Sequence, residues 1–226
     1  FQNRYWVIVL LFNLITSVTN GISASAGTYY SKWIFGNDNL VAVTGSFGLL
    51  ATILGFIFSK PIIAKLGVKK TVNFGLLGGA AMAAVKCIFP TNFTVNVSAG
   101  LIASFMQIPL MCLYGVLLAM AVDYNEYKYD KKLVAVSSGA IGFGNKVGGG
   151  IGSVLLTGFL AIGAYDATLE AATTSMRYSI YAFSNYLPLL LNIGMFLMFR
   201  KFDSEEKLPQ MRAEIAKRRE AKGGKD

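Results

Sequence analysis

Residues 133–162 read LVAVSSGAIGFGNKVGGGIGSVLLTGFLAI and carry a single charged side chain, Lys146. A membrane-crossing helix needs about 20 consecutive apolar residues, so this segment is long enough to cross a bilayer. Glycine, alanine and serine recur along it, as they do where membrane helices approach one another closely. The segment therefore predicts a transmembrane helix packed inside a bundle of others.

The composition of the 226-residue chain agrees with this prediction, because 54% of the residues are hydrophobic and only 15% are charged. A soluble domain carries about 25% charged residues, and a disordered chain has few apolar ones. The apolar runs are continuous and do not alternate as the strands of a membrane barrel do. The two cysteines, Cys87 and Cys112, lie in such runs and are interpreted as buried apolar residues. The sequence predicts an all-α integral membrane protein.

Six apolar segments predict six transmembrane helices within a bundle at 1–200, followed by a basic tail at 201–226. In the tail, Pro209 can open a short helix whose apolar residues Leu208, Met211 and Ile215 share one face. A helix on the membrane surface and a solvated tail fit this pattern equally well. The approximate spans are 5–30, 40–58, 71–89, 93–122, 133–162 and 176–199.

The basic residues indicate the orientation of these spans. Most of the 21 lysines and arginines lie at Arg4, at 60–70, at 128–132 or in the tail, all on one side of a six-span bundle. The other side has Lys32 and Arg177. Since cytoplasmic loops are rich in lysine and arginine, both ends of the chain are predicted to be cytoplasmic. This also accounts for the net charge of +9 without a nucleic-acid partner.

Lys146 is the most informative residue, because it lies near the middle of its span. A lysine there is too short to reach the surface of a hydrocarbon core about 30 Å thick, so it needs a polar cavity or a charge partner. A substrate site and a structural ion pair both fit this requirement. Two helix faces follow from the 3.6-residue period. The Lys146 face carries Ser138, Gly139, Gly142, Gly149, Gly150, Ser153 and Thr157, and the reverse face carries Gly144, Gly148 and Gly152.

Other polar residues in the spans have two interpretations, as cavity lining or as hydrogen bonds between helices. Asn13, Ser17 and Asn20 share one face of the first span, and Gln107 and Tyr114 flank Pro109 in the fourth. Asn145 precedes Lys146. Lys86, near the outer end of its span, is expected to extend to the surface.

Catalytic and metal sites are not predicted from this sequence. It has no histidine, and no aspartate or glutamate lies within a predicted span. The glycines at 144–152 have helix-packing spacing and lack the strand that precedes a phosphate loop. We therefore expect no enzyme activity, no metal site and no bound cofactor.

Several motifs together resemble the glycoside–pentoside–hexuronide:cation symporters, the major facilitator group that contains the melibiose and glucuronide carriers. The resemblance runs along nearly the whole chain. The motifs are YYSKWIFGN at 29–37, DYNEYK at 123–128, FGNKVG at 143–148, IGAY at 162–165 and EIAKRR at 214–219.

The resemblance implies a twelve-helix sugar carrier of the cytoplasmic (inner) membrane, in which this chain is the C-terminal six-helix half. Lys146 would lie near the sugar and cation sites, as a hydrogen-bond donor and a charge partner for acids of the N-terminal half. The Na⁺ or H⁺ that drives transport would be bound mainly by that other half. Asp123 and Glu126 resemble acids that close the cytoplasmic gate. The candidate substrate-binding residues are Lys146, Asn145, Gln107, Tyr114, Asn13 and Asn20.

The sequence departs from the melibiose-type pattern in the fourth span, where Met111 and Tyr114 stand in place of an aromatic stacking residue. Residues 65–70 resemble a reduced major-facilitator loop without its acid. Two other functions fit the sequence: a half-size carrier that associates with itself, and a membrane scaffold that transports nothing.

Overall fold

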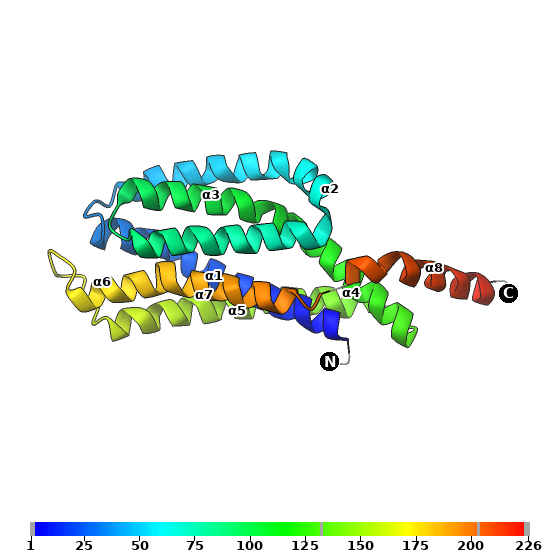
Figure 1. Ribbon diagram of the computed structural model, residues 1–226. Coiled ribbons are helices and arrows are strands. Elements are labelled where there is room, and N and C mark those ends of the chain that lie inside the picture. The colour runs from blue at the N-terminus through cyan, green and yellow to red at the C-terminus, as the bar shows by residue number, and fades with distance from the viewer. Residues whose placement is uncertain (1–2, 132, 203, 224–226) are drawn as a thin grey trace.

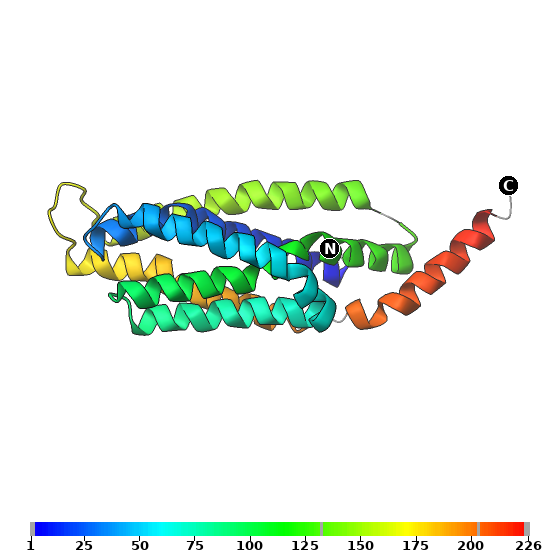
Figure 2. The same ribbon diagram turned by 90° about the horizontal axis from the view of Figure 1, so that it is seen from above.

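The computed structural model describes residues 3–131, 133–202 and 204–223, and within these ranges it is helical, with no strand (Figure 1). This confirms the all-α membrane fold. Most of the helices run side by side along one long axis (Figures 1 and 2). In chain order they are α1 (Arg4–Trp33), α2 (Leu40–Ile88), α3 (Phe93–Cys112), α4 (Tyr114–Tyr129), α5 (Val134–Ile162), α6 (Thr174–Tyr181), the π-helical turn η1 (Ala182–Tyr186), α7 (Leu187–Phe199) and α8 (Ser204–Gly223).

The long helix α2 is a hairpin. Its two arms, 40–66 and 68–88, run antiparallel and meet at Gly67, whose φ of 75° and ψ of 179° leave the helical region (Figure 1). Such a positive φ favours glycine, which has no Cβ to clash with the backbone. The predicted polar loop at 65–70 is therefore wrong, because helical structure continues up to this one residue on either side. Each arm is long enough to cross a membrane.

The described residues contain five apolar helices of membrane-spanning length, and one of them is the α2 hairpin. Its two arms bring the number of crossing segments to six. Both chain ends and the Gly67 turn lie at one end of the bundle, here called the termini end (Figure 1). The connections at 34–39, 89–92 and 163–173 lie at the opposite end, here called the distal end (Figure 1).

Two prolines coincide with irregular helix geometry. The α3–α4 rod is interrupted at Leu113, one turn after Pro109. The π turn η1 ends just before Pro188, which has no N–H to donate to the carbonyl one turn earlier. The charged stretch at 123–132, expected to be a loop, continues as helix to Tyr129 and ends at Asp130 in a left-handed conformation.

The tail helix α8 differs from the short surface helix expected at Pro209. It begins at Ser204 and runs through Pro209 for 20 residues. Met211 and Ile215 are 3% and 8% exposed, so its apolar face packs on the protein rather than on lipid. The Glu205 carboxylate accepts hydrogen bonds from the backbone N–H groups of Val68 and Lys69, at 2.9 and 2.7 Å. This contact joins the tail to the start of the second α2 arm.

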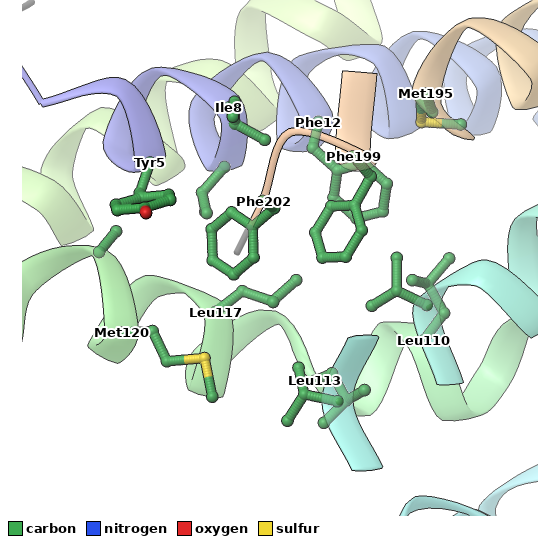
Figure 3. Close-up of a cluster of buried hydrophobic side chains, with 14 of the residues drawn as sticks. Tyr5, Ile8, Phe12, Leu110, Leu113, Leu117, Met120, Met195, Phe199 and Phe202 are labelled. Atoms are coloured by element: carbon green, nitrogen blue, oxygen red, sulfur yellow. The ribbon is translucent and has the colours of Figure 1, made fainter. Parts of the chain in front are cut away.

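The core has two clusters of buried side chains. The cluster near the termini end joins α1, α2, α3, α4 and α7 and includes three stacked or tilted rings, those of Phe12, Phe199 and Phe202 (Figure 3). The cluster near the distal end joins α1, α5, α6 and η1 around Ile22, Met176 and Ile180. Because lipid is as apolar as these side chains, close packing rather than escape from water holds such helices together.

The closest helix pairing that positions the candidate site is between α1 and α5. Gly144, Gly148 and Gly152 are buried against α1, which confirms the glycine face predicted from the sequence. A Cβ added at Gly148 would lie 2.6 Å from the Cβ of Ser17 and 2.8 Å from the carbonyl oxygen of Leu14. No larger residue fits there unless the helices move apart.

Candidate substrate site

Lys146 lies on the exposed face of α5, opposite the glycines that pack on α1. Its side chain makes no hydrogen bond or ion pair with the part of the chain that the structure describes. No other described helix packs closely on α5 around Gly142 and Gly150, since a Cβ added at either glycine would meet no described atom within 4 Å. The exposed residues of this face are Ser138, Gly139, Gly142, Lys146, Gly150, Ser153 and Thr157.

Asn145, next to Lys146, is held by two polar side chains of α1. Its Oδ1 accepts a hydrogen bond from Asn13 Nδ2 at 2.7 Å and another from Ser17 Oγ at 2.9 Å. Ser17 Oγ also donates to the carbonyl of Asn13 at 2.8 Å. The amide N–H groups of Asn145 remain free of partners among the described residues. The structure thus joins two of the predicted site residues, Asn13 and Asn145, beside Lys146.

Two other predicted residues form hydrogen bonds inside the bundle. Tyr114 donates to Thr16 Oγ1 at 2.6 Å, which ties α4 to α1. Gln107 Nε2 donates over a long 3.4 Å to Asn192 Oδ1, between α3 and α7. Asn192 in turn donates to the carbonyl of Pro188 at 2.8 Å. Tyr114 is thereby satisfied within the protein, whereas Gln107 is held only loosely.

Asn20 does not join either group. It is exposed on α1, and its side chain makes no hydrogen bond with the described residues. Its predicted partner on the same helix face, Ser17, is buried against α5. The polar stripe of α1 therefore divides into a buried part that binds α5 and an exposed part.

The predicted gate residue Asp123 lies at the termini end and forms an ion pair with Arg212 of α8, with 2.9 Å between Nε and Oδ2. The Asp123 side chain is 17% exposed and that of Arg212 is 59% exposed. Arg218 donates to the carbonyl of Tyr127 at 2.9 Å, one turn further along α4. Glu126, the second predicted gate residue, lies partly buried on the same helix.

The family of MFS/sugar transport proteins matches residues 1–206, which is most of the chain. The chain belongs to this family. Membership agrees with the all-helical membrane architecture, and it agrees with the expectation that the chain is not an enzyme, since the family consists of transporters.

Three curated relatives support the assignment of this MFS/sugar transport protein. The "Uncharacterized symporter YnaJ" of Bacillus subtilis is 26% identical over 206 residues, which are 91% of this chain and 44% of the relative. The "Putative glycoside/cation symporter YagG" of Escherichia coli is 20% identical over 98% of this chain and 48% of the relative. The "Inner membrane symporter YicJ" of Escherichia coli is 24% identical over 84% of this chain and 41% of the relative. The chain spans about half the length of these relatives.

The partners of Tyr114 and Gln107, which are Thr16 and Asn192, could not be predicted from the sequence. Helical periodicity does not show which helices are neighbours. The expectation that Lys86 extends to the outer surface is wrong. A Cβ added at Gly100, two turns inside α3, would lie 3.3 Å from the Lys86 ammonium. The sequence could have indicated this position. Side chains on a helix tilt toward its N-terminus, and the N-terminus of the second α2 arm lies away from the distal end.

Proposed function

We propose that this chain forms the C-terminal six-helix half of a sugar:cation symporter that works by alternating access. The observation that carries the proposal is the open, small-residue face of α5 with Lys146 at its centre. A lysine in the middle of a span is costly unless a polar cavity or partner receives it. The family match and the names of the relatives favour transport as the reason for this arrangement.

The N-terminal six-helix half is the proposed partner across that face. It would supply the second wall of the sugar site and the carboxylates that bind Na⁺ or H⁺. Two observations favour this partner. The chain spans about half of its relatives, and large apolar side chains such as Phe143 and Val154 are each 71% exposed on α5.

The proposed substrate is a glycoside, an oligosaccharide or a hexuronide. Sugar hydroxyl groups need donors and acceptors, and the site offers the ammonium of Lys146 and the free amide N–H groups of Asn145. The Asn13 and Ser17 hydrogen bonds fix the Asn145 side chain, so that it is oriented before a substrate arrives.

The proposed orientation places the termini end in the cytoplasm and the bundle in the inner membrane. Basic residues at 60–70, at 128–131 and on α8 lie at that end, which agrees with the excess of lysine and arginine in cytoplasmic loops of membrane proteins. There Asp123 and Glu126 would take part in closing the cytoplasmic gate. The Asp123–Arg212 ion pair supports an electrostatic role for the first of them.

The test is Lys146→Ala in the full-length carrier that contains this chain. We expect accumulation of radiolabelled methyl β-D-galactoside or methyl β-D-glucuronide, driven by a Na⁺ or H⁺ gradient, to be lost. Because the Lys146 side chain is exposed and makes no hydrogen bond or ion pair with the described residues, membrane insertion and melting temperature are expected to stay unchanged. Lys60→Ala, which removes an exposed lysine of α2, is the matched control. Normal accumulation by Lys146→Ala would contradict the assigned role.

A further inference from the structure

A second polar site lies inside the bundle, away from the Lys146 face. It is a cavity of about 430 Å³ bounded by α1, both arms of α2, α3, η1 and α7. Pockets that bind small ligands usually measure about 300–1,000 Å³. The cavity extends from Tyr30 and Phe35 near the distal end to Gln107 and Asn192 deeper in the bundle. Neither Lys146 nor Asn145 lines it.

Lys86 is the one charged residue among the described residues that line this cavity. It lies in the last turn of the second α2 arm, and its ammonium sits against Gly100 of α3. Gly100 is two helical turns, about 10 Å, from the start of α3, so the charge lies well inside the bundle. Lys86 Nζ makes no hydrogen bond or ion pair with the described residues. A lysine at membrane depth is expected to have a partner, and the described residues do not supply one.

Hydrogen bonds between helices and loops hold part of the cavity wall in place. Asn185 donates to the Tyr30 hydroxyl at 3.0 Å, and that hydroxyl donates to the carbonyl of Pro90 at 2.6 Å. Asn96 donates to the carbonyl of Phe89 at 2.8 Å. These hydrogen bonds hold the helix ends at the distal end of the cavity together.

Ser184 is the exception on the η1 side. Its Oγ is buried, and no described residue is its hydrogen-bond partner, while Ser184 lines the same cavity. It belongs to the π turn that precedes Pro188. Widened turns of this kind occur frequently at functional sites. Lys86 and Ser184 therefore give the cavity a cation and a buried hydroxyl, and no carboxylate is found among its described lining residues.

We propose that this cavity binds an oxyanion, a carboxylate or a phosphate group carried by a small molecule or a lipid headgroup, with Lys86 as its charge partner. Ser184 donates the second hydrogen bond. Gln107 lines the end of the cavity that lies deeper in the bundle, and its own hydrogen bond is long. It would contact other polar groups of the ligand. The site does not rest on the proposed transport function, since it is built within one six-helix bundle.

The test measures thermal melting of the purified full chain in dodecyl maltoside with inorganic phosphate, D-glucuronate or neutral D-glucose. In parallel, nanodiscs of phosphatidylcholine are compared with nanodiscs that also contain phosphatidylglycerol. Stabilisation by phosphate or glucuronate and not by glucose indicates a soluble ligand. Stabilisation by phosphatidylglycerol alone indicates a lipid headgroup. Either result supports the site if it depends on Lys86.

That dependence is tested with Lys86→Gln, which is expected to weaken the apparent anion affinity about tenfold or more, the effect of losing a charge-assisted hydrogen bond. Lys60→Gln removes a charge from the same helix outside the cavity and is expected to keep the full response. If Lys86→Gln does not fold, Ser184→Ala is the second test variant, and a smaller loss of anion affinity is expected for it. An absent anion response, an equal response to glucose, or an unchanged response in the cavity variants would overturn the proposal.

Discussion

The two faces of α5 consist of similar small residues and have opposite surroundings. On one face Gly144, Gly148 and Gly152 meet the backbone of α1 so closely that a single added carbon has no room. On the other face a Cβ added at Gly142 or Gly150 would meet no described atom within 4 Å. Glycine content alone therefore does not say which side of a membrane helix is packed.

Lys146 distinguishes the two faces. Against α1 its ammonium would be enclosed between tightly packed helices with no carboxylate nearby, which membrane interiors penalise heavily. The polar residues of α1 on the packed side are the neutral Asn13 and Ser17, which both donate hydrogen bonds across the interface to Asn145 of α5. The packed face thus holds α1 and α5 together, and the open face presents a charge that has no ion pair among the described residues.

The largest expected effect comes from Gly148→Val, which places a branched side chain in the α1 interface. The new Cβ would lie 2.6 Å from the Cβ of Ser17, so the helices have to separate. Overpacking of this kind costs about 1–3 kcal/mol and occasionally more. The free energy of unfolding, measured by denaturation in detergent, is expected to fall by at least that amount.

Gly150→Val is the matched control for this substitution, because it adds the same side chain two residues further along the same helix. A Cβ added at Gly150 would meet no described atom within 4 Å, so the main change is from the helix propensity of glycine to that of valine. Equal losses of stability in the two variants would mean that the faces do not differ as the structure indicates.

Much of this contrast could be predicted from the sequence. The 3.6-residue period separates Lys146 from the glycines at 144, 148 and 152, and small residues four apart are typical of close helix contacts. Six apolar segments were also apparent from hydropathy. These features depend on the residues within one segment, so a single sequence is enough to predict them.

The predictions that failed concern properties that depend on which helices contact one another. Polarity at 65–70 indicates where the chain leaves the membrane, but it does not say that one glycine makes the turn. The apolar face of α8 fits lipid and protein equally well until Met211 and Ile215 are seen to be buried. Likewise, the hydrogen bonds of Tyr114 and Gln107 join helices whose proximity is a tertiary property.

A smaller effect is expected for Asn145→Ala, which removes the acceptor shared by Asn13 and Ser17. Hydrogen bonds between membrane helices average about 0.6 kcal/mol and reach about 1.7 kcal/mol, so a loss of roughly 1 kcal/mol of unfolding free energy is expected. A double-mutant cycle with Asn13→Ala checks the pairing. Strictly additive losses would show that the 2.7 Å contact contributes nothing to stability.

The smallest expected effect is a gain, from Gly142→Ala on the open face. Glycine in the middle of a helix costs about 0.5–1 kcal/mol relative to alanine, and the added methyl group has free space here. The melting temperature of the chain alone is therefore expected to rise slightly. In the full-length carrier, a partner half packed on α5 would cancel or reverse this gain, because the methyl group would then meet its surface. A lower melting temperature of the chain alone would instead mean that α5 is covered on both sides by this chain, and the open face would not exist.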